Sequence, residues 1–160
     1  MVPHDSKSDL PLATEVWLAN IKDNNYGPSS ECIKAAIGYD YEKKAKKALE
    51  RLGLSYQDEY ELRDKGYDKT PDIKLDIPFA YNGHVINWIE SKALFGDEDH
   101  HAGYLRDQLW SYWNRYGPGM VIYWFGFIEE LDENRNKGII VCDDFPENIQ
   151  LCDPLNEDNN

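Results

Sequence analysis

The chain has 160 residues, of which 41% are hydrophobic and 13% aromatic, and its formal net charge at pH 7 is -13. A chain of this length buries roughly 70% of its unfolded surface, so we expect one domain with a substantial core. The charge argues against binding of nucleic acid through a general basic field. A nucleic-acid enzyme of this charge needs a cation or a local basic groove, for which the candidates are Lys43, Lys44, Lys46 and Lys47.

The cysteines and the lengths of the apolar runs indicate in which cellular compartment the protein is expected. Cys32, Cys142 and Cys152 form neither a CxxC pair nor a metal-ligand spacing, which favours a reducing environment. The N-terminal residues lack an apolar run of signal-peptide length, and no stretch approaches about 18 apolar residues. We therefore expect an intracellular protein that has no membrane segment.

The first part of the chain predicts a leader and a long helix. We expect residues 1–25 to be a short leader, in which Leu12–Ile21 can form a helix. After a Tyr-Gly-Pro breaker, Ser29 or Ser30 is a candidate N-cap for a helix that runs towards Leu52. Apolar residues recur along this segment at helical spacing, and a glycine follows it as a natural stop.

The central stretch predicts a β-hairpin. Leu54–Tyr60 favours a first strand or an irregular edge, and Glu59–Lys65 favours a helical turn. Ile73–Ile77 and His84–Lys92 then predict two strands that pair through a Tyr-Asn-Gly turn. Because Pro78 has no backbone N–H, we expect the first strand of this hairpin to end there, at an edge or a turn.

The second half predicts a helix, two strands and a tail. Asp97–His101 is expected to be a polar loop, and residues 102–116 show helical periodicity up to a Gly-Pro-Gly stop. Met120–Ile128 is almost continuously apolar, as in a strand buried on both faces, and Lys137–Cys142 predicts a last strand at an edge. Residues 143–160 carry six acids and no Lys or Arg, which indicates a solvated acidic tail. This order predicts an α/β fold with a mixed β-sheet flanked by helices.

A candidate site lies in the stretch TPDIKLDIPFAYNGHVINWIESK. Side chains of a strand repeat every two residues, so Glu90 and Lys92 project from one face, and Asp72 would join them across the hairpin. Magnesium takes one or two protein carboxylates and neutralises charge that develops on a phosphate, so this set suggests a magnesium-dependent phosphodiesterase. A compact ammonium such as that of Lys92 would stabilise the same charge.

Two helices offer further candidates, each with a simpler interpretation. Glu42 lies at the edge of the long helix's apolar stripe, where an acid is usually a surface residue. Gln108 and Tyr112 are four residues apart and share a helix face, where they are commonly surface or core residues. Adjacent His100 and His101 are a weaker, zinc-dependent alternative, because neighbouring histidines do not easily bind one ion together.

The motif strings resemble a known family. Glu42 on a helix, Asp72 after proline, Glu90-Ser91-Lys92 on a strand and Gln108-x-x-x-Tyr112 on the next helix resemble the PD-(D/E)xK nuclease superfamily, the last element being typical of its RecB-like members. More closely, GYDKTPDIKLDIP, INWIESKALFGDE and DQLWSYWNRYGPGMVIYWFGFIEELD are similar to the TPD-domain family of the codanin-interacting nucleases. The likeness covers residues 26–151.

The resemblance implies a restriction-endonuclease-like nuclease domain over residues 26–142, with Mg²⁺ or Mn²⁺ as cofactor. By motif position, the metal ligands are Asp72, Glu90 and the carbonyl of Ser91, the outer acid is Glu42, the catalytic lysine is Lys92, and the supporting helix element is Gln108 with Tyr112. It further implies a nucleic-acid substrate, DNA before RNA, a codanin-like protein partner, and a place in the nucleus, the cytoplasm or both. The family usually carries a long helical region before this domain, whereas a short leader is expected here.

One alternative remains open within this resemblance. The chain would then be a catalytically weak or inactive nuclease fold that serves as an interaction scaffold in a codanin-type complex. The acidic net charge favours the scaffold. The complete acid-acid-lysine set favours the enzyme, because a scaffold has no need to cluster carboxylates.

Overall fold

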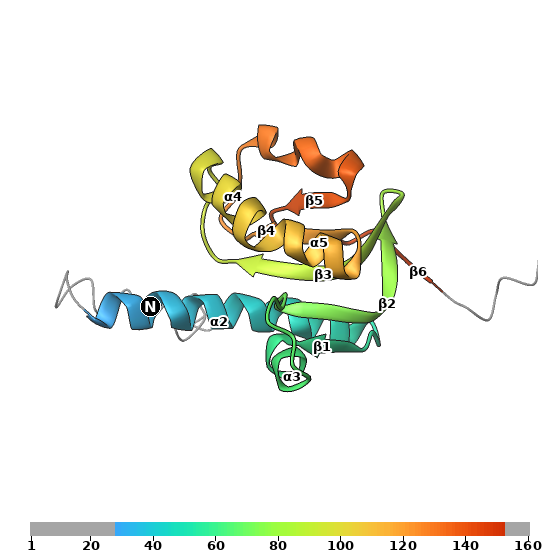
Figure 1. The fold of residues 1–160 in the computed structure, drawn as a ribbon, viewed down its shortest axis with the longest axis horizontal. Coiled ribbons are helices and arrows are strands. Elements are labelled where there is room, and N and C mark those ends of the chain that lie inside the picture. The colour runs from blue at the N-terminus through green and yellow to red at the C-terminus, as the bar shows by residue number, and fades with distance from the viewer. Residues whose placement is uncertain (1–27, 153–160) are drawn as a thin grey trace, which may run out of the picture.

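A six-stranded mixed sheet lies between a long helix on one face and shorter helices on the other (Figure 1). The computed structural model describes residues 28–152. The elements in chain order are α2 (Pro28–Arg51), β1 (Tyr56–Asp58), α3 (Glu59–Asp64), β2 (Ile73–Tyr81), β3 (His84–Lys92), α4 (Glu98–Tyr104), the π-helix η2 (Leu105–Leu109), α5 (Trp110–Tyr116), β4 (Gly119–Tyr123), the 3-10 helix η3 (Glu129–Lys137), β5 (Ile139–Cys142) and β6 (Ile149–Leu151). The expected α/β class with a mixed sheet flanked by helices is confirmed.

The long helix α2 agrees with the sequence prediction. It buries Ile33, Ala45 and Leu49 and ends at Arg51, shortly before Gly53, whose φ of 72° lies in the left-handed region. Glycine adopts that conformation without the steric penalty of a Cβ, so the chain can leave the helix there. The predicted leader, residues 1–25, lies outside the described residues.

The strand β1 and the helix α3 divide the segment that the sequence left ambiguous. Among the strands that the structure describes, β1 pairs with β2 alone and therefore forms an edge of the sheet. Asp58 ends β1 and caps α3, since its side chain accepts a hydrogen bond of 2.8 Å from the backbone N–H of Glu61. This cap explains why the strand stops before Tyr60, where the sequence prediction had extended it.

The hairpin of β2 and β3 is confirmed, but the first strand is longer than expected. β2 continues past Pro78 to Tyr81, and its register with β3 shifts between Lys74 and Phe79. Pro78 lies inside this irregularity, where its missing N–H removes no regular ladder bond. The turn that follows uses Asn82 and Gly83, both at positive φ, as in a tight two-residue hairpin.

The helix after the hairpin begins earlier than expected. Asp97 accepts a hydrogen bond of 2.8 Å from the backbone N–H of His100, so α4 starts at Glu98 and takes in most of the predicted polar loop. The prediction of a loop at 97–101 was wrong because an N-cap Asp starts a helix even when its first turn is polar. The helix widens into η2 before α5 and ends at Gly117, whose φ is 89°.

The apolar run after α5 forms a shorter strand than expected. All five residues of β4 are buried, and the strand runs parallel to both β3 and β5. It ends at Tyr123, because the chain turns back with a bond from the N–H of Gly126 to the carbonyl of Tyr123. Residues 124–128 are therefore not strand, while β5 is at the sheet edge as predicted.

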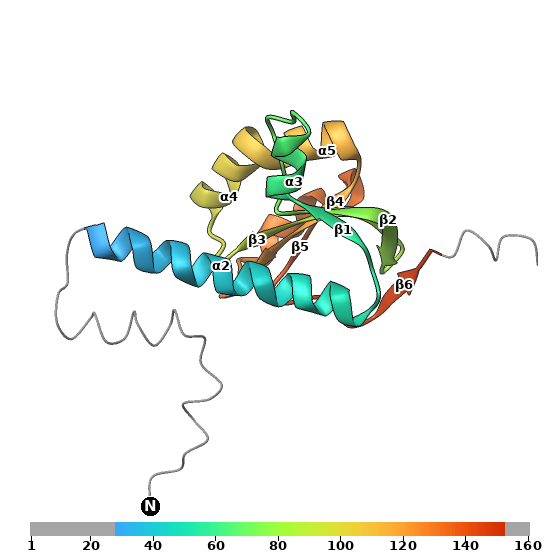
Figure 2. The ribbon, with the colours of Figure 1, turned by 90° about the horizontal axis from the view of Figure 1, so that it is seen from below.

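The acidic C-terminal stretch contains structure that the composition did not indicate. Residues of β6, Ile149–Leu151, pair antiparallel with the end of β2, so this part is not simply solvated. Figure 2 shows β6 alongside β2, beyond the C-terminal end of α2. β2 thus pairs with β1 in its first half and with β6 in its second.

Alternate residues of β4 divide the core between the two faces of the sheet. Met120 and Ile122 pack with Ala45 and Leu49 towards α2. Val121 and Tyr123 pack with the helices on the opposite face. A strand with both faces covered is apolar along its length, as the sequence of β4 indicated. None of the helices within residues 28–152 combines the length and apolarity that a membrane span requires.

Candidate active site

A polar pocket of about 220 Å³ lies where β2 begins and β3 ends. Its walls come from α3, the loop before β2, the end of β3 and the helix that follows it. The lining residues are Glu59, Arg63, Asp68, Lys69, Thr70, Asp72, Glu90, Ser91, Lys92, Gln108 and Tyr112. The structure therefore brings together six of the seven residues selected from the sequence.

Asp72 and Glu90 form the acidic centre of the pocket. The backbone N–H of Asp72 donates to Glu90 Oε1 at 3.2 Å, and Asp72 Oδ2 accepts from the backbone N–H of Ser91 at 2.8 Å. Glu90 is buried. Burial, and then the negative charge of Glu90, raises the pKa of Asp72 well above its ordinary value. The pair thus carries negative charge at a desolvated position.

Lys92 is held beside this pair by two groups from the following helix. Its Nζ donates to Gln108 Oε1 at 2.7 Å and lies 4.0 Å from the centroid of the Tyr104 ring. A carbonyl oxygen and an aromatic face are both good partners for a lysine side chain. Lys92 also lowers the pKa of Asp72, although burial and Glu90 outweigh it. The ammonium therefore faces the carboxylates from a fixed position.

Gln108 and Tyr112 reach different members of the site from one helix. Gln108 contacts Lys92. Burial, and then the charge of Glu90 and hydrogen bonding to it, raises the pKa of the Tyr112 hydroxyl. Tyr112 is buried against Trp88, with ring centroids 5.3 Å apart. Gln108 lies in the π-helix η2, a local widening that often occurs at functional sites. Tyr112 is thus a core residue, as the simpler interpretation allowed, and both residues also line the pocket.

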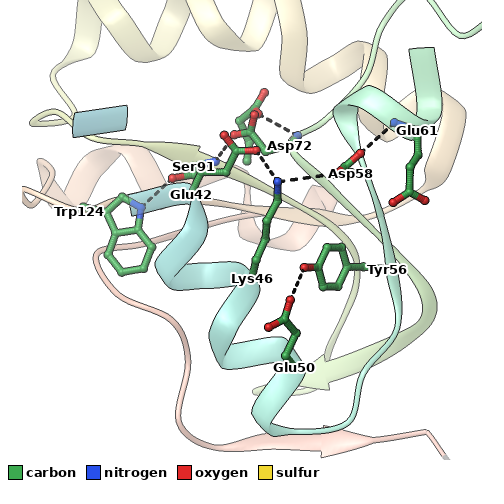
Figure 3. Close-up of polar contacts among 10 residues, drawn as sticks. Glu42, Lys46, Glu50, Tyr56, Asp58, Glu61, Asp72, Ser91 and Trp124 are labelled. Carbon is green, nitrogen blue, oxygen red and sulfur yellow. Dashed lines mark hydrogen bonds and ion pairs between the residues drawn. The ribbon is translucent and has the colours of Figure 1, made fainter. Parts of the chain in front are cut away.

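Glu42 reaches the same region from the opposite face of the sheet. Figure 3 shows it pointing from α2 towards Asp72, while Lys46, one turn later, lies 3.0 Å from it and 4.0 Å from Asp58. Burial, and then the charge of Asp72, raises the pKa of Glu42. Glu42 is not among the residues that line the pocket. It adjoins the acidic pair as an outer acid and already has a lysine partner.

The basic side chains of the pocket differ from those expected. Lys46 is paired with acids, and Lys44 lies 5.1 Å from the ring centroid of Trp124. The pocket is lined instead by Arg63 and Lys69, in addition to Lys92. Arg63 pairs with Glu59 at 2.5 Å, and Lys69 donates to the carbonyl of Asp107 at 3.1 Å.

The sequence analysis did not select Arg63, Lys69 or Thr70 as pocket residues. Lys69 and Thr70 directly precede the Pro-Asp pair, so their place in the chain was a usable signal. Thr70 is buried and accepts from Arg63 Nε at 3.4 Å. Arg63 belongs to a short helix whose position is set by the pairing of β1 with β2. No local sequence pattern therefore predicts that Arg63 lines the pocket.

The two adjacent histidines point to different surroundings. His100 is exposed and its Nδ1 lies 2.6 Å from Asp97 Oδ2. His101 is buried and its Nδ1 shares a hydrogen bond of 2.7 Å with the Tyr123 hydroxyl, while burial lowers its pKa. A site shared by both histidines is thus contradicted by the structure.

The donor set of the pocket fits a hard divalent cation. Within residues 28–152, no three His, Cys, Asp or Glu side chains form a ready-made metal-binding group. Magnesium does not need one, since one or two carboxylates suffice when waters and phosphate oxygens complete its shell. Trp124 N–H donates to the carbonyl of Lys92 at 3.1 Å, so the carbonyl of Ser91, one residue earlier, is directed to the opposite edge, where Asp72 lies.

The fold and the pocket together define an α/β protein with an acid-acid-lysine site at the end of a sheet strand. The sequence profile of the TPD family, described as "Protein of unknown function TPD sequence-motif", matches residues 8–145, and the chain belongs to this family. Curated relatives named "CDAN1-interacting nuclease 1" are 56% identical in Homo sapiens and 53% identical in Danio rerio, each over 145 residues.

These matches cover 90% of this chain but 52% of the human and 48% of the zebrafish protein. A third relative of the same name, from Xenopus tropicalis, is 56% identical over 88% of this chain and 46% of its own length. The chain therefore spans about half the length of the curated relatives it matches. No solved structure matches it.

Proposed function

We propose that this chain is a nuclease that hydrolyses phosphodiester bonds with the help of Mg²⁺ or Mn²⁺. The observation that carries the proposal is the convergence of Asp72, Glu90 and Lys92 in one pocket, with Gln108 bonded to the lysine. The name of the relatives agrees with it. A mixed sheet with the acids and lysine at its strand ends is also what the resemblance to PD-(D/E)xK nucleases implied.

The residues divide the chemistry between them. Asp72 and Glu90, with the carbonyl of Ser91, would hold the cation, which supplies charge neutralisation on the phosphate and a more acidic bound water. Lys92 stabilises the negative charge that develops on the phosphate oxygens, and Gln108 keeps its ammonium in place. Tyr112 orients the Glu90 carboxylate, and Glu42 provides negative charge behind Asp72.

The substrate and partner are proposed from the resemblance and the relatives' names. DNA is the preferred substrate, RNA the less favoured one. The relatives are named for an interaction with CDAN1, so we also propose a codanin-like protein partner. The corresponding location is intracellular, in the nucleus or the cytoplasm.

A cleavage panel tests this function. Single-stranded, duplex and flapped DNA and an RNA strand are incubated with the purified 160-residue chain in Mn²⁺, in Mg²⁺ and in EDTA. We expect cleavage of DNA with either metal and none in EDTA. A Lys92→Ala preparation, purified identically, controls for contaminating nucleases, and equal cutting by it would refute the assignment.

A thermal-shift measurement separates the enzyme from the inactive scaffold. A cation present at about 100 times its dissociation constant stabilises a folded protein by about 2.7 kcal/mol. We expect Mn²⁺ to raise the unfolding temperature of the wild-type chain and not that of Asp72→Ala. The absence of a shift, together with no cleavage, would favour the scaffold.

A further inference from the structure

A second groove opens beside the active-site pocket and shares Ser91 and Lys92 with it. Its volume is about 560 Å³, within the range of pockets that bind small molecules. It lies between the first half of α2 and the loops that follow β3 and β4. Because two residues belong to both cavities, a ligand that fills the groove would lie next to the active-site pocket.

Two aromatic rings give the groove its apolar character. Phe95 and Phe125 line it, and each is 50% exposed. The rings of Tyr41 and Phe125 pack in a T-shaped arrangement, with centroids 5.3 Å apart. The two loops are joined by a hydrogen bond of 2.9 Å from the N–H of Gly96 to the carbonyl of Gly126. The rings are thus exposed on tethered loops, as in surfaces that receive a ligand.

The lining of the groove differs in charge from the chain as a whole. Its lining residues, all in the described part of the chain, include no Asp or Glu. The lysines among them are Lys34, whose ammonium lies 3.7 Å from the exposed carboxylate of Glu31, and Lys92. The chain as a whole has a net charge of -13. Flat apolar faces beside lysines, in a lining without acids, are complementary to a strand of nucleotides, in which bases offer π-faces and phosphates carry the charge.

Gly38 forms part of the groove wall that belongs to α2. It lies within α2, where glycine costs about 1 kcal/mol relative to alanine. A Cβ at this position would meet nothing within 4 Å, so packing inside the protein does not require a glycine. Gly38 lines the groove, and the absence of a side chain keeps the space open.

We propose that this groove is a nucleobase-binding subsite, which takes an unpaired base of the substrate strand next to the phosphate that is cut. The proposal rests on the nuclease function proposed above and narrows its substrate to single strands and unpaired ends. A base inside a duplex is paired and covered by its neighbours on both faces, so it enters such a groove only after leaving the stack.

The test uses the 160-residue chain and a fluorescently labelled single strand of about 12 nucleotides. Binding is measured by anisotropy in EDTA, which stops metal-dependent hydrolysis, and compared with the duplex of the same sequence. We expect the single strand to bind more tightly. Phe125→Ala should weaken single-strand binding roughly five- to tenfold, since stacking on one ring is lost.

Matched variants separate the groove from the fold. Gly38→Trp fills the space and should abolish the preference for the single strand, whereas Gly38→Ala should bind like wild type. Tyr39→Ala removes an exposed ring from the same helix outside the groove and should change nothing. Thermal unfolding of each variant shows whether it is folded.

Each outcome decides the proposal. Equal binding of single strand and duplex, or single-strand binding that Gly38→Trp leaves intact in a folded protein, overturns it. Loss of binding to a codanin-type protein in Phe125→Ala, with oligonucleotide binding unchanged, would show a protein-docking groove instead. If no nucleic acid is cut with Mn²⁺, the proposed function fails, and binding in EDTA still decides the groove.

Discussion

The two faces of the sheet carry different kinds of core, and the site depends on both. The face under α2 is mainly aliphatic, with Ala45 and Leu49 packed on sheet residues such as Ile89. The opposite face is richer in aromatics that have a polar group, among them Trp88 and Tyr112. Aromatic residues of this kind fill a core and still direct a hydrogen bond.

This difference explains where the catalytic candidates lie. Glu90 and Lys92 are two residues apart on β3, and both are contacted from the aromatic face, by Tyr112 and Gln108. From the aliphatic face comes Glu42, which is already paired with Lys46. We infer that the aromatic face positions the reacting groups and that the aliphatic face adjusts their charge.

The largest effect is expected for the lysine itself. Lys92→Ala should lower the cleavage rate by about a thousandfold, because the group that stabilises the developing phosphate charge is lost. The unfolding temperature should stay near that of wild type, since Lys92 is only partly buried. Cleavage assays and thermal unfolding check this, and a rate within tenfold of wild type would remove Lys92 from the mechanism.

The packing of the aromatic face can be broken at Gly119. An added Cβ would overlap the buried ring of Trp88, whose Nε1 donates to the carbonyl of Gly117 at 2.8 Å. Gly119→Ala should therefore destabilise the fold by about 3 kcal/mol. The open position on the other face, Gly38→Ala, should instead stabilise it by up to about 1 kcal/mol. Denaturant unfolding measures both, and equal effects would contradict the contrast between the faces.

Smaller effects on the cleavage rate are expected for Gln108 and Glu42, which reach the site from two different helices. Gln108→Ala releases Lys92 and should lower cleavage about tenfold to a hundredfold, in line with loss of a positioning hydrogen bond. Glu42→Gln keeps an acceptor for Lys46 and should lower cleavage about tenfold or less. The pH dependence of the cleavage rate should differ between Glu42→Gln and wild type. It would stay the same if Glu42 had a purely structural role. A larger loss in Glu42→Gln than in Gln108→Ala would reverse the assignment.

The last prediction concerns the pH dependence of stability. The pKa of Asp72 is raised in the folded protein, so the native state binds the proton more tightly than the unfolded chain. In EDTA, this contribution to stability is complete below the unfolded pKa of about 3.9 and is lost as pH rises through the folded pKa. Asp72→Asn cannot ionise at this position, so its stability should not fall in that pH range.

In EDTA at neutral pH, Asp72→Asn should thus be more stable than wild type. Addition of Mn²⁺ should make wild type the more stable of the two. The cation would bind the ionised pair and stabilise wild type at neutral pH, and the stabilisation should fall at acidic pH because protons compete for the carboxylates. Asp72→Asn should show little of it. Thermal unfolding over a pH series, with and without Mn²⁺, checks both halves. An Asp72→Asn protein that follows the wild-type curve would show that Asp72 does not dominate the titration.

Much of the fold was readable because local rules act over short distances. The hairpin strand His84–Lys92, the stop after α2 and the buried character of β4 follow from periodicity and turn residues. The errors occur where a partner distant in the sequence decides the outcome. β2 passes Pro78 because β3 and β6 hold it on either side, and β6 itself carries too few residues for a local signal.

The sequence by itself identified the candidate residues: Glu90 and Lys92 at strand spacing with Asp72 across the hairpin, and Gln108 with Tyr112 one helical turn apart. Tertiary structure decided what surrounds them. It brought Arg63 and Lys69 to the pocket, where the sequence had indicated the lysines of α2, and placed Phe95 and Phe125 in the adjoining groove. The physical reason is that residue type and spacing fix chemistry and direction along one element, whereas neighbours across elements depend on how the sheet pairs and packs.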